Sequence, residues 1–262
     1  MTFELTRLRF HLRAAGSLFF PPGKAGNVLR GAFGMKLRET ADAPDYHRIF
    51  EPRTIDGPSG LADPPRPFVF RAAHLNGRTI PPGEAFHFDA HLFDTRAETR
   101  PHFVTAFASW GRAELLHVDQ HDVAIDLDQP GERATGVRIT FVTPTELKPV
   151  TRPEFAVLFA RLRDRISTLR ALYGPGPLDI GFRALGERAA QVRMTRCELS
   201  WQETERRSSR TGQTYRIGGF TGFAEYAGEL SEFLPYLRAG QWTGVGRQTV
   251  WGKGEICFQV CS

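Results

Sequence analysis

The stretch "FELTRLRFHLR" at residues 3–13 alternates apolar and polar side chains with the period of a β-strand. One side of such a strand carries Leu8, Phe10 and Leu12. The other side carries Arg7, Arg9, His11 and Arg13. A strand of this kind fits a sheet with one face on a core and one open face. The basic open face suits contact with a polyanion, although an ordinary solvated face explains it equally well.

The elements predicted around this strand follow the order βαββαβ. An apolar stripe at helical spacing predicts a helix directly after the strand, and further strands and a second helix follow. The predicted ranges are 25–39 (helix), 67–72 and 84–94 (strands), 100–116 (helix) and 121–127 (strand).

The second half of the chain repeats this order. A capping-box spacing from Thr151 to Glu154 precedes a helix that runs to Tyr173 and ends at Gly174. The remaining ranges are 137–142, 191–201, 214–226 and 255–260 (strands) and 230–239 (helix). We therefore predict an α+β protein with two tandem ferredoxin-like domains, over residues 1–130 and 135–262. RNA-recognition modules and many unrelated functions share this architecture, so the fold alone does not decide function.

Basic charge is concentrated in two segments of the 262-residue chain, which has a net charge of +5. Residues 1–40 carry 7 basic and 2 acidic groups, and residues 152–216 carry 13 and 7. Arginine supplies nearly all of this charge and suits phosphate, which favours an anionic partner. A coding bias toward arginine would explain why arginine is preferred to lysine, but not why the basic residues are concentrated in two segments. The N-terminus does not resemble a signal peptide, and no apolar run spans a bilayer, so we expect a cytoplasmic protein without membrane partners.

The histidines and cysteines give little indication of a metal. Cys197, Cys257 and Cys261 form no C-x-x-C pair. His87 and His91 lie four residues apart in a predicted strand, where side chains are about 13 Å apart. His117 and His121 have the same spacing, and we expect them to straddle a loop between helix and strand, with no third ligand. We predict no metal site and no cofactor.

The stretch "GQWTGVGRQTVWGKGE" at 240–255 combines glycines with cations and tryptophans. It lacks the P-loop pattern. Backbone amides in such a loop can bind phosphates, and the glycines expected to shape it are Gly244, Gly246, Gly252 and Gly254. We expect Arg247 and Lys253 to be exposed and to meet phosphates. A glycine-bent entry into the last strand is the alternative.

Five stretches of the chain resemble the CRISPR-associated RAMP proteins, most closely the endoribonucleases that process precursor CRISPR RNA. They are "GNVLRGAFGMKLRE" at 26–39, "YHRIFEPR" at 46–53, "RPFVFRAA" at 66–73, "VRITFVTPTELK" at 137–148 and the glycine-rich region at 218–255. The resemblance covers essentially the whole chain, and the glycine-rich loop is its most specific part. It implies two ferredoxin-like domains.

The resemblance also implies metal-independent RNA cleavage, in which a 2′-hydroxyl attacks the adjacent phosphate and leaves a 2′,3′-cyclic phosphate. Such chemistry needs a base, an acid and a cation. Many relatives use a histidine near the first helix, which here is His47, with Tyr46 and Arg53 beside it. His11 is the competitor. The arginines expected to bind RNA, besides those of the loop, are Arg30, Arg38, Arg207 and Arg210.

Two other functions remain open at this point. RAMP folds also serve as non-catalytic RNA-binding subunits of CRISPR ribonucleoproteins, and the basic features would suit that role equally well. A small-molecule enzyme is a weaker third reading. The expected partners are CRISPR repeat RNA, other subunits of CRISPR effector complexes and a second copy of the chain as a homodimer.

Overall fold

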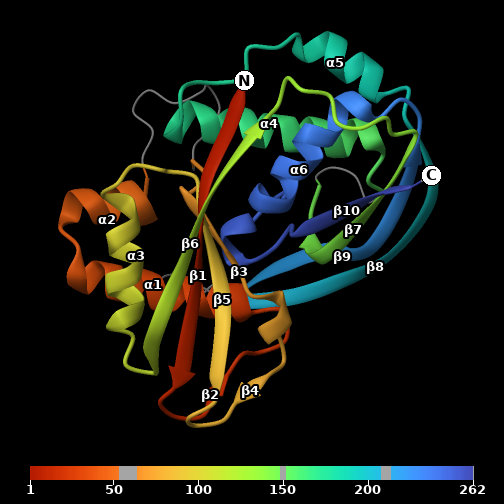
Figure 1. The fold of residues 1–262 in the computed structure, drawn as a ribbon. Helices are drawn as coiled ribbons and strands as arrows, with labels where there is room; N and C mark the ends of the chain where they lie inside the picture. The colour runs from red at the N-terminus through yellow and green to blue at the C-terminus, as the bar shows by residue number, and fades with distance from the viewer. Residues whose placement is uncertain (53–63, 148–151, 208–213, 262) are drawn as a thin grey trace. The chain divides into compact units, whose positions relative to one another are not determined.

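The computed structural model of the chain describes residues 1–52, 64–147, 152–207 and 214–261. Contacts divide the chain into two compact units. The first comprises Met1–Ile125, Ser167–Leu178 and Val250–Gly252, and the second comprises Asp126–Ile166, Asp179–Thr249 and Lys253–Ser262. Each unit is built on its own four-stranded sheet (Figure 1).

The sheet of the first unit has the strand order β3-β5-β1-β6. This is the order of a ferredoxin-like sheet, whose first strand lies in the middle beside the third and fourth. The main strands are β1 (Thr2–Ala14), β3 (Phe68–Arg71), β5 (Ala85–Leu92) and β6 (Ala113–Asp126). The helices are α1 (Ala25–Thr40), α2 (Ala43–Phe50) and α3 (Thr99–Ala108). A small ribbon, β2 (Leu18–Phe19) with β4 (Thr79–Ile80), and a 3-10 turn (Ala73–Leu75) complete the unit.

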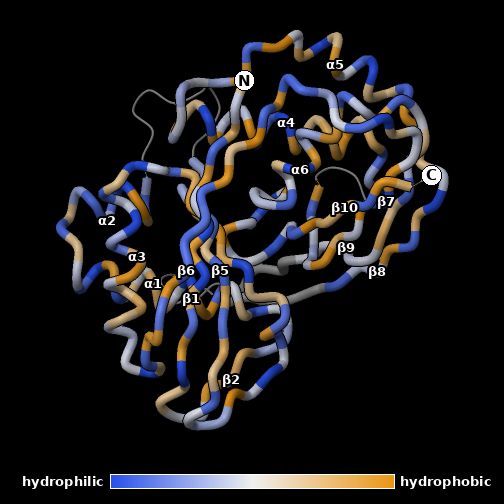
Figure 2. Tube along the Cα trace, viewed as in Figure 1, coloured by the Kyte–Doolittle hydropathy of each residue, from blue (hydrophilic) through white to orange (hydrophobic). Residues whose placement is uncertain are grey.

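The apolar side of β1 is buried as its alternation predicts. Leu8, Phe10 and Leu12 are at most 1% exposed and belong to one core with α1 and α3. Phe33 of α1 stacks on Phe103 of α3 at 4.1 Å between ring centroids, at the centre of this core. Apolar and polar stretches alternate along the strands of the sheet in Figure 2. The opposite face is polar, and there Arg9 binds Asp89 at 2.7 Å.

The predicted helix over 100–116 is too long, and the strand predicted over 121–127 begins earlier. The helix ends at Ala108, and β6 begins at Ala113. Gly111 lies between them with φ +73, a conformation that favours glycine and interrupts a helix. The segment after it contains good helix formers, but pairing with β1 outweighs that local preference. His117 therefore lies on a strand and not in a loop.

The sheet of the second unit has the strand order β10-β7-β9-β8, again the ferredoxin-like arrangement. The strands are β7 (Gly136–Thr145), β8 (Arg193–Arg207), β9 (Thr214–Ala227) and β10 (Ile256–Cys261). The helices are α4 (Phe155–Tyr173), α5 (Phe182–Ala189) and α6 (Leu234–Thr243), with 3-10 turns at Ser231–Phe233 and Thr249–Trp251. The predicted α+β class with two tandem ferredoxin-like folds is confirmed.

Helix α4 begins and ends as predicted, at Phe155 and just before Gly174. Thr151 of the predicted capping box lies outside the described residues. Phe155 packs against Tyr226 of β9 and Phe233 of the turn before α6, and Phe159 also packs against Phe233. Within the described part of the chain, no helix is both long and apolar enough to cross a membrane.

Candidate active site

Helix α2 begins at a strong local start signal. The Asp42 side chain accepts a hydrogen bond from the Asp45 amide at 2.9 Å, and Pro44 lies in the first turn. Only Ile49 of this short helix is fully buried. The helix therefore presents Tyr46 and His47 at its surface, with Tyr46 partly packed against the core of the first unit.

Arg48 joins α2 to the segment before α3. Its guanidinium binds Asp45 at 2.7 Å and Asp94 at 2.8 Å, and it also donates to Thr99. The Asp94 side chain is 0% exposed, and Arg96 binds it at 2.7 Å. Burial opposes ionisation of Asp94, but hydrogen bonds from Arg96 and Thr99 outweigh it and lower the pKa of this carboxyl. This network fixes the orientation of α2.

Helix α2 also lies very close to α1. Gly34 of α1 has no Cβ, and the ring of Phe50 fills the space that a Cβ would occupy. The Arg30 guanidinium, also of α1, lies over the Phe50 ring, 4.5 Å from its centroid. The pair of helices thus brings cations of α1 near the aromatic and imidazole side chains of α2.

A cavity of about 350 Å³ opens where the two helices meet. Its lining includes Arg38, Tyr46, His47 and Glu51, together with Ala41, Asp42 and Ala43 of the connecting turn. The Tyr46 hydroxyl donates to one Glu51 oxygen at 3.4 Å, and His47 Nδ1 lies 3.8 Å from the other. The His47 side chain is 49% exposed, so a ligand in the cavity can reach it. Arg30 acts electrostatically on Tyr46 as well. The structure thus brings together four residues that the sequence analysis singled out, which are Arg30, Arg38, Tyr46 and His47.

The cavity combines three chemical capabilities. The imidazole of His47 is a side chain that can accept or donate a proton. Burial and the neighbouring Glu51 raise the pKa of Tyr46, so its phenol stays protonated and can donate a hydrogen bond. Arg38 is exposed at the rim and supplies a positive charge suited to phosphate. This set matches the base, acid and cation that transfer of a phosphodiester to a neighbouring hydroxyl requires.

Glu51 is a site residue that sequence reasoning did not single out. It is four residues after His47, a spacing that places two side chains on one face of a helix. The Glu51 amide also closes the end of α2 by donating to the His47 carbonyl at 3.2 Å. The i,i+4 spacing of His47 and Glu51 is the sequence feature from which Glu51 could have been identified.

The other predicted catalytic and arginine positions are placed as follows. Arg53 and Arg210 lie outside the described residues, and Arg207 ends β8 with a side chain that is likewise not described. His11 lies on the open face of the first sheet and binds Asp119 at 2.9 Å, so the structure does not bring it together with His47 on α2.

The glycine-rich loop is tightly packed, with Gly244, Gly246 and Gly254 in the second unit and Gly252 in the first. Gly244, Gly246, Gly252 and Gly254 all have φ between 68 and 82. A Cβ on Gly246 would lie 2.5 Å from the Glu146 carbonyl oxygen, and one on Gly254 would lie 2.0 Å from that of Val245. The Gly254 amide donates to Pro144 at 3.1 Å. These glycines are therefore needed for the conformation of the loop itself, whatever the loop binds.

The two cations of the loop differ in exposure. Arg247 is 56% exposed and lies 3.7 Å from a Glu146 oxygen. The prediction that Lys253 is exposed is wrong, because it is only 6% exposed. Burial lowers the pKa of Lys253 to about 8, although the charge of Glu146 acts in the opposite direction. Sequence reasoning missed this because a lysine between two glycines is typical of a solvated turn.

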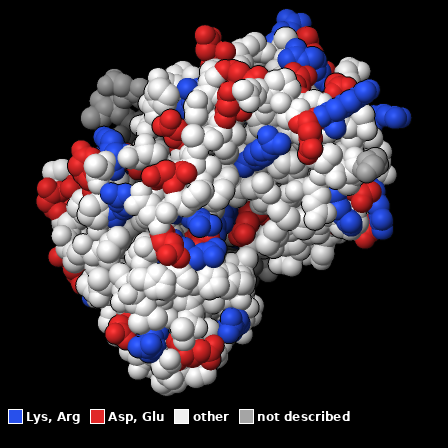
Figure 3. Space-filling view, in the orientation of Figure 1, with Lys and Arg blue, Asp and Glu red and all other residues white. Residues whose placement is uncertain are grey.

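Charged side chains of both signs are mixed on the surface that Figure 3 draws. Several arginines are paired with carboxylates, as Arg188 is with Glu232 at 2.7 Å and Arg13 with Glu114 at 3.2 Å. Segregation of basic residues along the sequence therefore does not produce a purely basic face in this view. For binding of an anionic partner, a local cluster of cations such as the one at α1 and α2 is therefore more informative than the net charge of a sequence segment.

Comparison with known families matches both parts of the chain. Residues 139–256 match the model of the family described as CRISPR-associated endoribonuclease Cas6. Residues 3–129 match a second family model, described as an N-terminal domain. No curated protein sequence is significantly similar to the chain.

Solved structures share the fold over nearly the whole chain. A product complex of Cas6 from Thermus thermophilus has a TM-score of 0.65 at 16% identity, covering 98% of this chain and 100% of that one. A substrate mimic complex of a second Cas6 has a TM-score of 0.54 at 20% identity, covering 98% and 100%. A partial Cas6-RT-Cas1–Cas2 complex has a TM-score of 0.66 at 12% identity, covering 98% of this chain and 46% of that one. The C-terminal part of the chain thus matches the Cas6 family of CRISPR-associated endoribonucleases, and the chain shares the two ferredoxin-like folds of solved Cas6 structures.

Proposed function

We propose that the chain cleaves CRISPR repeat RNA in the precursor transcript, without a metal ion, and so releases guide RNAs. The 2′-oxygen forms a bond to the adjacent phosphorus, and the bond from phosphorus to the 5′-oxygen breaks. The products are a 2′,3′-cyclic phosphate and a 5′-hydroxyl. The observation that carries the proposal is the exposed His47 in a cavity with Tyr46, Glu51 and Arg38, in a chain that matches the Cas6 endoribonuclease family.

His47 is the group proposed to move a proton. As a base it takes the proton of the 2′-hydroxyl, and as an acid it gives a proton to the leaving 5′-oxygen. One imidazole performs only one of these roles in a single step. Tyr46, held protonated, donates a hydrogen bond to the phosphate or the leaving oxygen, and Arg38 and Arg30 balance the charge that develops on the phosphate.

Glu51 is proposed as the positioning residue of this site. Its two oxygens face Tyr46 and His47 separately, at 3.4 and 3.8 Å. It can therefore hold both side chains toward the cavity. Arg53 follows Glu51 by two residues, and its contribution to the phosphate charge stays a proposal from the sequence alone.

The glycine-rich loop is proposed to bind the RNA backbone through Arg247, because the amides of Gly244, Val245, Arg247 and Gly254 already donate to carbonyls of the protein. Arg207, which ends β8, and Arg210, three residues later in the sequence, are proposed as further phosphate contacts. Lys253 is too buried to contact a phosphate directly, but its charge contributes to a positive electrostatic potential beneath the loop. Other CRISPR subunits are proposed as partners, a proposal supported by the solved complex that contains Cas6 together with Cas1 and Cas2.

Incubation with repeat RNA in excess EDTA tests the proposed reaction. We expect cleavage at one position in the repeat, with a terminal mass that corresponds to a 2′,3′-cyclic phosphate. Cleavage that requires added metal would contradict the proposal, as would a 5′-phosphate product. Tight binding without product over hours would instead favour a non-catalytic RNA-binding subunit.

A further inference from the structure

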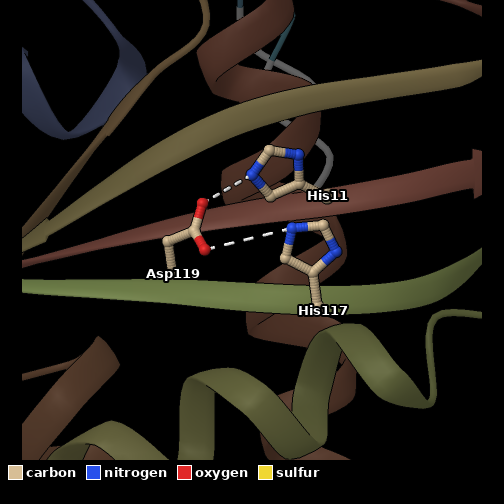
Figure 4. Close-up of side chains that lie close together, drawn as sticks. All are labelled: His11, His117 and Asp119. Atoms are coloured by element: carbon tan, nitrogen blue, oxygen red, sulfur yellow. Dashed lines mark hydrogen bonds and ion pairs between the residues drawn. The ribbon is translucent and has the colours of Figure 1, made fainter.

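Three potential metal ligands meet on the open face of the first sheet. His11 comes from β1, and His117 and Asp119 come from β6 (Figure 4). His11 Nε2 lies 2.9 Å from one Asp119 oxygen, and His117 Nε2 lies 3.9 Å from the other. The ligand atoms of all three residues lie within 4.8 Å of one another.

The strand geometry explains this grouping. His11 alternates with the buried Phe10 and Leu12, so its side chain points away from the core. His117 and Asp119 are two residues apart on β6 and therefore lie on the same face. Because β6 is the neighbour of β1, the two residues come directly beside His11. The sequence pattern of H-x3-H drew attention to His121, whereas the ligand spacing that matters is H-x-D.

We propose that His11, His117 and Asp119 bind one divalent first-row transition-metal ion of the zinc class. Two imidazole nitrogens and one carboxylate oxygen are a usual ligand set for such ions, with water in the open positions. Magnesium and calcium prefer sites built from oxygen alone, so they are disfavoured here. The ion would join β1 to β6 at the surface of the sheet.

The site is accessible and can adapt without backbone movement. The three side chains are 30%, 59% and 55% exposed in the order His11, His117, Asp119. The two imidazole rings are stacked at 4.0 Å between centroids, with 12° between their planes. Each ring directs one nitrogen toward Asp119 (Figure 4), and rotation about the last side-chain torsion of an exposed ring can bring both nitrogens onto one ion. This torsion has a broad distribution in histidine.

The surrounding charges permit a cation. Arg9 is bound to Asp89 at 2.7 Å and Arg13 to Glu114 at 3.2 Å, so each nearby guanidinium already faces a carboxylate. A hydrogen bond from His11 lowers the pKa of the Asp119 carboxyl, which is therefore ionised at neutral pH. This face is opposite the core on which α1 packs, and His47 lies on α2. The metal site is thus separate from the proposed cleavage site.

Titration of the full chain with Co²⁺ tests the proposal, because a bound ion with nitrogen ligands shows visible d–d absorption. We expect saturation at one ion per chain, displacement by Zn²⁺ and no competition from Mg²⁺. Zn²⁺ should raise the melting temperature. Binding should weaken as the solution is made more acidic, because protons compete with the metal ion for the imidazole nitrogens.

Variants separate this site from general binding by surface histidines. His11→Ala, His117→Ala and Asp119→Asn should each weaken Co²⁺ binding at least about tenfold, as even residues outside the ligand set often do. His121→Ala is the matched control, because it removes a histidine from the same strand and should bind as the unmodified chain does. The melting temperature without metal shows that each variant is folded. Absence of a stoichiometric Co²⁺ signal would overturn the proposal, and so would equal binding by all four variants.

Discussion

Gly34 of α1 lies against the ring of Phe50 of α2, so closely that a Cβ on Gly34 would be 2.2 Å from Phe50 Cζ. This approach sets the distance between the helices that border the proposed active site. The Arg30 guanidinium, 4.5 Å from the centroid of the Phe50 ring, and the Phe33 ring, 6.2 Å from it, also restrict the movement of this ring. The position of His47 therefore depends on a buried residue that does not line the cavity.

Gly34→Ala should displace α2 and reduce both stability and cleavage. Overpacking of this kind costs about 1–3 kcal/mol. Urea unfolding and single-turnover cleavage measure the two effects. Gly31→Ala is the matched control, since Gly31 lies on the same helix with nothing near its Cβ position and should gain about 0.5–1 kcal/mol from the helix preference of alanine. Equal behaviour of the two variants would show that the contact between Gly34 and Phe50 does not position α2.

Glu51→Gln should lower the cleavage rate only modestly. The Glu51 contacts are long and about half exposed, and such ion pairs are worth about 1 kcal/mol or less. This corresponds to a rate loss of up to about fivefold, with the affinity for RNA unchanged and the pH–rate profile shifted. Glu39→Gln, which removes the partner of Lys36 on α1, is the control. A loss of several hundredfold would mean that Glu51 itself moves a proton.

Asp94 should make the first unit sensitive to acid. Its pKa is lowered in the folded chain, so its stabilising effect is complete above the unfolded value of about 4 and is lost as pH falls through the folded value. Asp94→Asn should be less stable at neutral pH and should lose less stability between pH 5 and pH 2. Thermal melts across this range measure the difference. An unchanged acid profile in the variant would mean that other carboxylates dominate.

Lys253 should make stability rise in alkaline solution. Its pKa is about 8 in the folded chain and higher when unfolded, so between about pH 8 and 10.5 the unfolded chain binds more protons. Stability therefore increases with pH over this window, because the buried ammonium loses its charge. Lys253→Met should be more stable at pH 7 and should lack the rise. Parallel profiles for the two proteins would show that Lys253 is not buried in its charged form.

Arg247→Ala should weaken RNA binding with little effect on folding. Loss of one phosphate contact should reduce the slope of log K against log salt by about 1 unit. Arg183→Ala is the control, because Arg183 is 93% exposed on α5. If the two variants keep the same affinity and salt slope, Arg247 does not meet a phosphate, and the loop is a structural turn.

Regular patterns in the sequence predicted most of the fold. The alternation of β1, the stripe of α4 and the tandem βαββαβ order all follow from the placement of apolar residues, which packing then enforces. The apolar pattern did not predict the end of α3 correctly, because pairing of β6 with β1 overrides the helix preference of the segment after Gly111. Residue type and spacing therefore predicted elements better than they predicted where one element gives way to the next.

The candidate sites were predicted less completely. Tyr46 and His47 were found from their neighbourhood along the chain, but Glu51 became apparent only once helical geometry placed it beside them. The trio of His11, His117 and Asp119 depends on a strand boundary that was misplaced by eight residues, from 121 to 113. Burial of Lys253 depends on how the loop packs, which no local pattern reveals.

Single-turnover cleavage of repeat RNA by His47→Ala, in EDTA and beside His11→Ala, tests the central claim most directly. We predict that His47→Ala cleaves about 10²–10⁴-fold more slowly while binding the RNA with unchanged affinity, because a general acid or base typically contributes this much. His11→Ala should cleave at the rate of the unmodified chain. Cleavage at full rate by His47→Ala, or loss of rate in His11→Ala alone, would contradict the account.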